Sequence, residues 1–177
     1  GGRHLSWRDL TSGDQELPPA ELPAEAPAMI VYTSGTTGKP KGTVHSHCGF
    51  MTKVALDYGI IFDLQAGDRL LWLSDMGWLT GPILVVAVPL MGATLVLAEG
   101  VPDYPEPGRL WRLVQDHRIS FLGVAPTMIR AFIQQQPENV TQYDLSSLRI
   151  TAATGEPWTP EAWNWFRQKV GKNRVPI

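Results

Sequence analysis

The sequence predicts an α/β fold with a mainly parallel sheet and helices on both faces. The first observation is that short β-rich runs alternate with segments of helical length from Met29 onward, which is typical of successive βαβ units. The second is that capping and turn residues at several boundaries fit this alternation. The predicted strands are the runs 29–33, 69–74, 94–98, 119–124 and 148–153.

The predicted helices lie between and after these strands, at about 46–58, 79–91, 108–116, 126–135 and 160–170. The last has the clearest boundaries. Thr159 stands at the N-cap, Pro160 at the first helical position and Gly171 just past the end, with Arg167 and Lys169 in the last turn. These residues satisfy or complement the free backbone groups at the two helix ends, so they favour a helix here.

The segment 80–93 is apolar on nearly every face, with the sequence TGPILVVAVPLMGA. A helix of this kind is expected to be buried on all sides rather than to lie on the surface. Its apolar run 83–91 is too short to span a bilayer and contains Pro89. We therefore expect a buried helix and no membrane partner.

Composition narrows the class of protein. The chain has 177 residues, 44% of them hydrophobic and 18% charged, with a net charge of −2, as expected for a globular domain with a real core. Since long runs of like charge are missing, no nucleic-acid partner is expected. Cys48 is the only cysteine, which rules out an internal disulfide and favours a reducing, cytoplasmic setting.

The first 27 residues differ from the rest. The stretch 11–27 holds four prolines and four acidic residues, a composition that favours extended, solvated chain. We interpret 1–27 as a linker or surface strap and 28–177 as part of one domain. The chain starts without a clear element and stops at RVPI, which resembles the opening of a further strand, so we expect a fragment that is truncated at both ends.

A glycine-rich loop follows the first predicted strand, in the stretch YTSGTTGKPKG. We expect this loop at the carboxyl end of a parallel strand, where α/β sheets bind ligands. Its glycines let the backbone approach a ligand, and its hydroxyls and backbone N–H groups suit phosphate oxygens. The candidate phosphate-binding residues are Thr33, Ser34, Gly35, Thr36, Thr37, Gly38, Lys39 and Lys41.

This loop is not a Walker A motif. Only Thr36 and Thr37 separate Gly35 from the Gly38-Lys39 pair, and Pro40 follows the lysine where Walker A has a serine or threonine for Mg²⁺. An ordinary P-loop NTPase is therefore disfavoured. On spacing alone, a Gly/Thr turn without a ligand remains an equal alternative.

The stretch HSHC at 45–48 raises two other chemistries, a metal site and a Cys/His nucleophile. A metal site needs three or four converging ligands, and no second cysteine exists. A nucleophile pair lacks an orienting third group. We instead expect Ser46 to cap the following helix and Cys48 to pack inside it. No metal ligand and no catalytic residue is assigned within this chain.

The motifs carry a family resemblance. YTSGTTGKPKG resembles the signature loop of the adenylate-forming superfamily, which includes acyl-CoA synthetases, luciferases and peptide-synthetase adenylation domains. Further stretches are similar, in order and spacing, to the acetyl-CoA synthetase branch. They are GWLTG at 77–81, EGVPDYP at 99–105, APTMIRA at 125–131, DLSSLR at 144–149 and GEPWTPEAWNWF at 155–166. The resemblance implies part of the large domain of an acyl-adenylate-forming enzyme.

The resemblance also implies roles for individual residues. The loop would hold the β and γ phosphates of ATP, and His45 would support the nucleotide pocket. Gly155, Glu156 and Pro157 would line the adenine side, mostly through backbone, although the tripeptide alone reads as an ordinary turn.

The acyl pocket would be walled by Trp78, Leu79, Thr80 and Thr154. Large residues at 78 and 79 suggest a small acid such as acetate or propionate. The usual acetate pattern prefers valine at the positions of Leu79 and Thr154, so the acid is left open. For Trp78, an ordinary core aromatic is the alternative.

The function implied is ATP-dependent activation of a short-chain carboxylic acid through an acyl-adenylate, followed by transfer to coenzyme A. ATP, Mg²⁺ and coenzyme A would be substrates or cofactors of the full-length enzyme, and the rest of the parent chain its main partner. The magnesium carboxylate, the ribose aspartate and the lysine of a C-terminal domain would lie after Ile177. The alternatives are an inactive structural or interaction module, or adenylation for a non-CoA acceptor.

Overall fold

A computed structural model describes residues 6–13, 18–33, 38–135 and 139–177. Its centre is a parallel sheet in which β4 (Thr94–Val96), β3 (Arg69–Trp72), β5 (Phe121–Val124) and β6 (Ile150–Ala153) lie side by side in that order. Each of these strands falls inside a run that the sequence predicts. The prediction of an α/β fold with a mainly parallel sheet is therefore confirmed.

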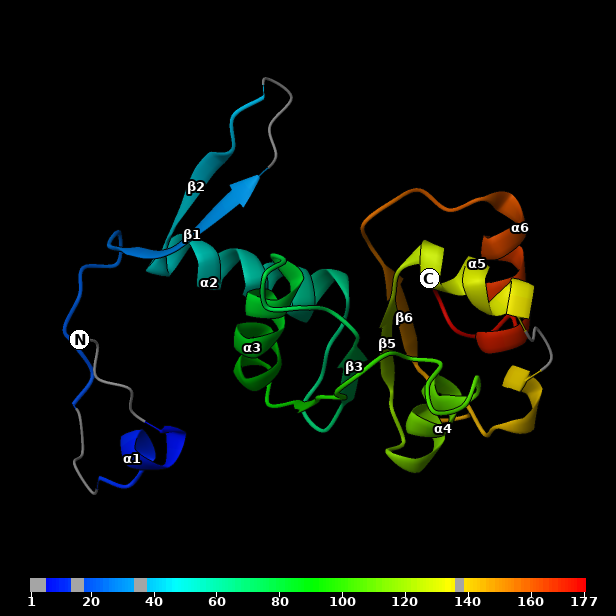
Figure 1. Cartoon of the computed structure of the whole chain (residues 1–177). Coiled ribbons are helices and arrows are strands. Elements are labelled where there is room, and N and C mark those ends of the chain that lie inside the picture. Colours follow the sequence, from blue (N-terminus) through cyan, green and yellow to red (C-terminus); the bar gives the residue numbers. More distant parts are fainter. Residues whose placement is uncertain (1–5, 14–17, 34–37, 136–138) are drawn as a thin grey trace.

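Helices cover both faces of this sheet (Figure 1). On one side lie α2 (His47–Ala55) and α3 (Thr80–Leu90), and α2 continues into the π-helical turn η1 (Leu56–Ile61). On the other side lie α4 (Arg109–Asp116), α5 (Pro126–Gln135) and α6 (Pro160–Trp165). The 3-10 turn η2 (Asn139–Gln142) precedes β6, and the π-helical turn η3 (Phe166–Val170) extends α6.

Two apolar cores follow from the alternation of side chains along the strands. Leu70 and Phe121 pack with the residues of α2, η1 and α3, whereas Leu71 and Leu122 pack with those of α4, α5 and η3. Successive strand residues point to opposite faces, so one strand feeds both cores. All four residues of β5 are buried, as expected for a central strand of a two-sided parallel sheet.

The first predicted strand does not join this sheet. β1 (Pro27–Thr33) pairs with β2 (Lys41–Ser46) as an antiparallel hairpin, with Thr33 opposite Lys41. The expectation that the glycine-rich loop follows a parallel strand is wrong, because the chain after the loop returns along β1. Within 41–46, only Thr43 and Val44 are β-branched residues that favour a strand, so the sequence signal for β2 is weak.

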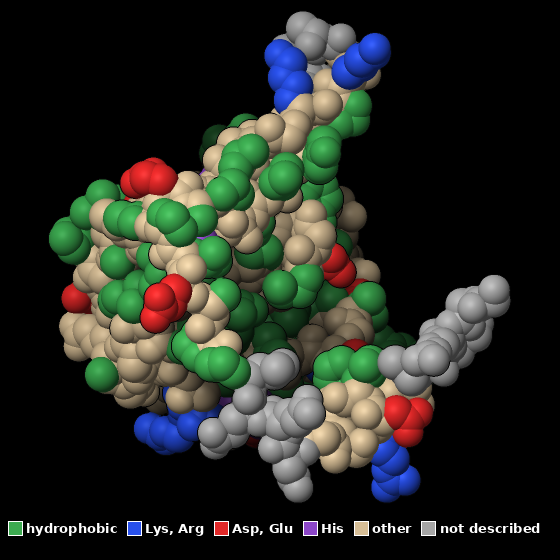
Figure 2. Space-filling view, turned by 90° about the vertical axis from the view of Figure 1, so that its left-hand side faces the viewer, with side chains coloured by type: hydrophobic (Ala, Val, Ile, Leu, Met, Phe, Trp, Pro, Cys, Tyr) green, Lys and Arg blue, Asp and Glu red, His purple; other side chains and the backbone are tan. Residues whose placement is uncertain are grey.

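The hairpin stands away from the body of the molecule and has basic side chains at its described end (Figures 1 and 2). No residue of either strand is buried. Ile30, Tyr32 and Val44 are large apolar side chains that remain exposed. The hairpin is therefore held mainly by its own backbone pairing.

The helix predictions hold closely. Thr159 caps α6 by accepting a hydrogen bond from the Ala162 N–H at 3.3 Å, and Pro160 is its first residue. The expectation that segment 80–93 is buried on all sides is only half right. Leu84, Ala87 and Val88 are buried, but Val85 and Leu90 are 49% and 42% exposed. α3 packs against α2 and the sheet on one side only, which leaves its opposite face open.

Other features lie outside the predicted elements. The strap region contains a short helix, α1 (Trp7–Thr11), which begins with a capping box formed by Ser6 and Asp9. At the other end of the chain, the Pro176 carbonyl accepts hydrogen bonds from the Thr151 N–H and hydroxyl at 3.0 and 2.7 Å. In the part of the chain that the structure describes, no helix is long and apolar enough to cross a membrane.

The amino ends of the strands are tied together by an ion-pair cluster. Arg149 pairs with Asp68 and, at 2.7 Å, with Asp63, while the Ser120 hydroxyl donates to Asp68 at 2.7 Å. Burial raises the pKa of Asp68, but the hydrogen bonds from Arg149, the Gln65 N–H and Ser120 outweigh it, and the net pKa is lowered. The carboxylate is therefore charged in the folded protein and fixes this edge of the sheet.

Candidate functional site

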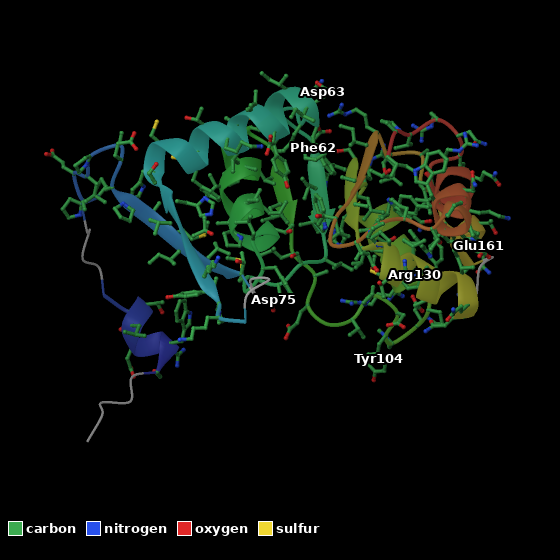
Figure 3. All side chains as sticks on the ribbon, turned by 90° about the horizontal axis from the view of Figure 1, so that it is seen from above. Phe62, Asp63, Asp75, Tyr104, Arg130 and Glu161 are labelled. Atoms are coloured by element: carbon green, nitrogen blue, oxygen red, sulfur yellow. The ribbon has the colours of Figure 1, made fainter. Side chains whose placement is uncertain are left out.

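A cavity of about 580 Å³ lies at the carboxyl ends of β3, β5 and β6. It is built from three segments that are far apart in the sequence, and α/β proteins bind ligands at this edge of the sheet. In Figure 3, Asp75 and Arg130 lie on this side of the molecule, whereas Phe62 and Asp63 lie on the opposite side. The lining residues are Trp72, Leu73, Ser74, Asp75, Trp78, Leu79, Thr80, Ala125, Thr127, Thr154, Gly155 and Glu156.

The first wall is the turn between β3 and α3. The Asp75 carboxylate accepts a hydrogen bond from the Gly77 N–H at 2.6 Å, and the Asp75 carbonyl accepts one from the Trp78 N–H at 3.1 Å. Gly81 is buried against this turn, and a Cβ there would lie 2.7 Å from the Asp75 carbonyl oxygen. A glycine is thus required for α3 to begin this close to the turn.

The second wall is the turn after β6. The Thr154 N–H donates to the Val124 carbonyl at 3.3 Å, which keeps the end of β6 beside the end of β5. Gly155 follows with φ of 103°, a backbone conformation that a side chain would strain. The chain therefore turns sharply at Gly155 and brings Glu156 to the rim of the cavity.

Glu156 is held by residues of α5. Its Oε1 accepts from the Thr127 N–H at 2.6 Å and from the Thr127 hydroxyl, and its Oε2 accepts from Arg130 Nη2 at 2.7 Å. These hydrogen bonds, that from the Thr127 hydroxyl first and that from Arg130 next, lower the pKa of Glu156. The carboxylate is charged and its oxygens point to the helix rather than to open solvent.

The floor of the cavity depends on a close contact between Trp72 and Gly123. A Cβ at Gly123 would lie 1.9 Å from the Trp72 ring, so the indole lies directly on the backbone of β5. Trp72 also lines a neighbouring cavity of about 650 Å³, formed with Leu97–Pro102 and Met128. The two cavities share residues 72–75, which makes the carboxyl edge of the sheet hollow over much of its width.

The predicted acyl-pocket residues Trp78, Leu79, Thr80 and Thr154 all line the first cavity. Trp78 is 73% exposed, so the alternative of an ordinary core aromatic is wrong. Of the predicted adenine-side residues, Gly155 and Glu156 line the same cavity, while Pro157 is exposed beside it. The roles of these residues toward a ligand stay predictions.

The predicted phosphate residues lie on the hairpin. Thr33 ends β1, Lys41 begins β2, and Gly38 has φ of 90°. Both Lys39 and Lys41 are exposed. Ser34, Gly35, Thr36 and Thr37 lie outside the described residues. In Figure 1 the hairpin stands apart from the sheet, and none of its residues lines the cavity.

The stretch HSHC gives one confirmed and one wrong expectation. Ser46 caps α2 by accepting from the Gly49 N–H at 3.2 Å, as predicted. Cys48 is exposed instead of packed inside, because it lies in the first turn of α2 on the side away from the core. His45 contacts Phe50 edge-on, with ring centroids 5.6 Å apart. Among the described residues, no three His, Cys, Asp or Glu side chains converge as metal ligands would.

Sequence reasoning did not single out Trp72, Asp75 or Thr127 as site residues. The sequence contains signals for two of them, Asp75 and Thr127. Asp75 comes directly after a predicted strand and stands two residues before a glycine, which is the pattern of an Asx turn at a ligand edge. Thr127 lies in the APTMIRA stretch, just after another predicted strand. The contact of Trp72 with Gly123 joins two strands, so the sequence alone gave no signal for it.

A further cavity, of about 520 Å³, lies along β6 and is lined partly by Pro176 and Ile177. It contains none of the residues that the sequence predicted for the site. Its mixed lining, from Ile61 and Arg149 to Ala153, follows the side of β6 that carries no further strand in the described residues. We therefore assign the site to the carboxyl edge of the sheet.

The candidate site is an open cavity at the carboxyl ends of parallel strands, the edge at which α/β proteins bind ligands. The model of the AMP-binding enzyme family matches residues 3–177. This chain belongs to the AMP-binding enzyme family.

Individual relatives agree with this assignment. The chain is 43% identical to an acetyl-coenzyme A synthetase of Laribacter hongkongensis, over 100% of this chain and 27% of that protein. It is 44% identical to an acetyl-coenzyme A synthetase of Pasteurella multocida, over 99% and 27%. Among solved structures, acetoacetyl-CoA synthetase from Streptomyces lividans matches with a TM-score of 0.82 and 29% identity, over 96% of this chain and 26% of that one. The chain thus spans about a quarter of the length of these relatives.

Proposed function

We propose that the full-length protein containing this chain activates a short-chain carboxylic acid with ATP, forming an acyl-adenylate and pyrophosphate, and then transfers the acyl group to coenzyme A. The observation that carries the proposal is the cavity, in which Trp78–Thr80 and Thr154–Glu156 meet although they are distant in sequence. The names of the relatives, acetyl-coenzyme A synthetases, supply the reaction class.

This reaction requires that the protein position the substrates and stabilise negative charge. It requires no side-chain nucleophile. The acid's own carboxylate attacks the α-phosphate, and pyrophosphate leaves with developing negative charge. Lys39 and Lys41 at the exposed end of the hairpin supply positive charge toward the β and γ phosphates, together with Thr33 and the loop residues between them. The turn Gly155-Glu156-Pro157 lines the adenine side.

Mg²⁺ is proposed as the ion that accompanies ATP. It would neutralise part of the triphosphate charge. We assign no side chain of this chain to it, because no converging set of carboxylate or imidazole ligands exists among the described residues. None of the roles proposed for these residues therefore involves the ion.

The acid pocket favours a small substrate. Trp78 and Leu79 line the cavity, and large side chains at these two positions favour a small acid. Thr154 adds a hydroxyl where a fully apolar wall would suit acetate, and apolar pockets separate acids that differ by one methylene by only about 10- to 200-fold. We propose acetate or propionate as the substrate class.

Acid-dependent exchange of labelled pyrophosphate into ATP tests the proposal. The full-length protein is expected to show exchange with acetate and propionate and weaker exchange with longer acids. A second assay follows formation of the acyl-CoA thioester. Exchange without thioester formation would indicate adenylation for a non-CoA acceptor, and absence of both would overturn the proposal.

The 177-residue chain alone is expected to show no exchange, because the resemblance assigns the metal carboxylate and the catalytic lysine to other parts of the enzyme. Strong exchange by this chain would contradict that expectation. If the full-length protein is also inactive, the remaining candidate is a structural or interaction module.

The domain division and the location of the protein are proposals as well. Residues 28–177 form part of the AMP-binding domain, and 1–27 a surface strap. Every described residue before Ala26 is exposed, which supports the strap. The free, exposed Cys48 supports a reducing, cytoplasmic setting.

A further inference from the structure

The turn that carries Glu156 makes few backbone hydrogen bonds. From Gly155 to Trp158, no backbone hydrogen bond is present among the described residues, and the nearest one upstream is from Thr154 to Val124. Gly155 has no atom within 4 Å of where a Cβ would be. The Glu156 side chain therefore supplies the hydrogen bonds that hold this turn, between the Thr154 bond upstream and the contact of the Trp158 ring with Phe166 downstream.

The Glu156 side chain is fixed at both of its oxygens. Oε1 accepts from the N–H and the hydroxyl of Thr127 in the first turn of α5, and Oε2 accepts from Arg130 one turn later. Arg130 also donates to the Thr127 hydroxyl at 2.7 Å, which closes the cluster. The side chains of Arg130 and Glu156 are only 33% and 32% exposed, so the pair is partly shielded from water.

The carboxylate suits this place electrostatically. The first N–H groups of a helix have no partner within the helix, and the positive end of the helix dipole favours an anion there. A charge-assisted hydrogen bond from an arginine is stronger than a neutral one. The carboxylate of Glu156 is thus already occupied by protein donors and is poorly placed to contact a nucleotide itself.

We propose that Thr127 and Arg130 are positioning residues, which act through Glu156. They hold its carboxylate against α5 by hydrogen bonds and so fix the backbone of the Gly155–Pro157 turn beside the cavity. This inference deepens the proposed function, on which it rests, because it states how the turn is kept in the geometry that receives the nucleotide.

The test uses the full-length protein and the variant Arg130→Gln. Loss of the ion pair is expected to let the turn shift, which raises KM for ATP about tenfold while kcat stays within about twofold. This is the signature of lost binding that is equal in the ground state and the transition state. Arg130→Lys is expected to restore part of the affinity, since it returns the charge with fewer donors. The ATP dissociation constant, measured by calorimetry without the acid, should change by the same factor.

A matched control is available on the same side of the sheet. Arg112 pairs with Glu106 at 2.8 Å, with side chains 45% and 41% exposed, and lies outside the cavity. Arg112→Gln removes an ion pair of the same type and is expected to leave KM for ATP unchanged. Thr127→Val removes the hydroxyl but keeps the N–H, and it serves as a second test if Arg130→Gln does not fold.

A double-variant experiment tests whether Arg130 acts through Glu156. Glu156→Gln alone is expected to raise KM for ATP, and the double variant Glu156→Gln/Arg130→Gln should be no worse than Arg130→Gln alone. Independent, additive effects, or an unchanged KM for ATP in Arg130→Gln, would overturn the inference. If the wild-type protein binds ATP but shows no acid-dependent exchange, the proposed function fails. The ATP dissociation constants of the variants still decide whether Thr127 and Arg130 position the turn.

Discussion

Every residue of β5 is buried, whereas no residue of β1 or β2 is. β5 is an inner strand of the sheet, and its Gly123 supports the Trp72 ring that lines the cavity, while the hairpin stands apart and carries the lysines of the predicted phosphate loop. The two parts of the candidate site therefore depend on different forces. Packing maintains the cavity, and local backbone pairing maintains the hairpin.

Because the sheet is buried and the hairpin is not, substitutions in these two regions are expected to affect stability and activity separately. Substitutions in the sheet should lower the free energy of unfolding and affect the cavity only as a consequence. Substitutions at the hairpin end should affect ligand binding with little effect on stability, because they remove no buried contact.

The largest expected effect is that of Phe121→Ala on stability. Phe121 is fully buried and contacts the rings of Tyr58, Phe62 and Trp72. Its truncation should lower the free energy of unfolding by about 3–5 kcal/mol. The matched control is Ile30→Ala in β1, where the side chain is 56% exposed and the loss should stay within about 0.5 kcal/mol. Denaturant unfolding measures both, and equal losses would remove the contrast between the two regions.

The second effect is that of Lys41→Ala on activity. Loss of one charge at the phosphates should slow adenylation by the full-length protein about 100-fold. The melting temperature should not change measurably, since Lys41 is exposed. Lys53→Ala is the control, because Lys53 is an exposed lysine paired with Asp57 on α2. Pyrophosphate exchange measures the rate, and an unchanged rate for Lys41→Ala would remove this residue from the phosphate site.

The smallest effect is the pH dependence of the Asp68–Arg149 pair. The pKa of Asp68 is lowered from 3.8, so its contribution is present above that pH and is lost as the pH falls through the folded-state pKa. At pH 7, Asp68→Asn should lower the melting temperature by about 2–4 °C. The difference from the wild type should shrink toward zero below the folded-state pKa. A difference that stays constant down to strong acid would contradict the assignment.

The buried sheet is also the part of the fold that the sequence predicted well. The strands 69–72, 94–96, 121–124 and 150–153 lie inside the predicted runs, since a strand buried on both faces reads as a continuous apolar run. The N-cap of α6 was visible because Thr159 and Pro160 are neighbours in the sequence. The hairpin was misjudged because an apolar run followed by a glycine-rich loop occurs both before a helix and in a β-turn.

The sequence by itself determined the strand and helix order, the cap residues and the motifs that identify the family, since each depends on residues close together in the chain. The tertiary structure decided which of these segments meet. It placed Trp78–Thr80 beside Thr154–Glu156, laid Trp72 on Gly123, and turned the carboxylate of Glu156 toward Thr127 and Arg130. Such contacts depend on the order of strands within the sheet, and a local pattern of residues carries no information about that order.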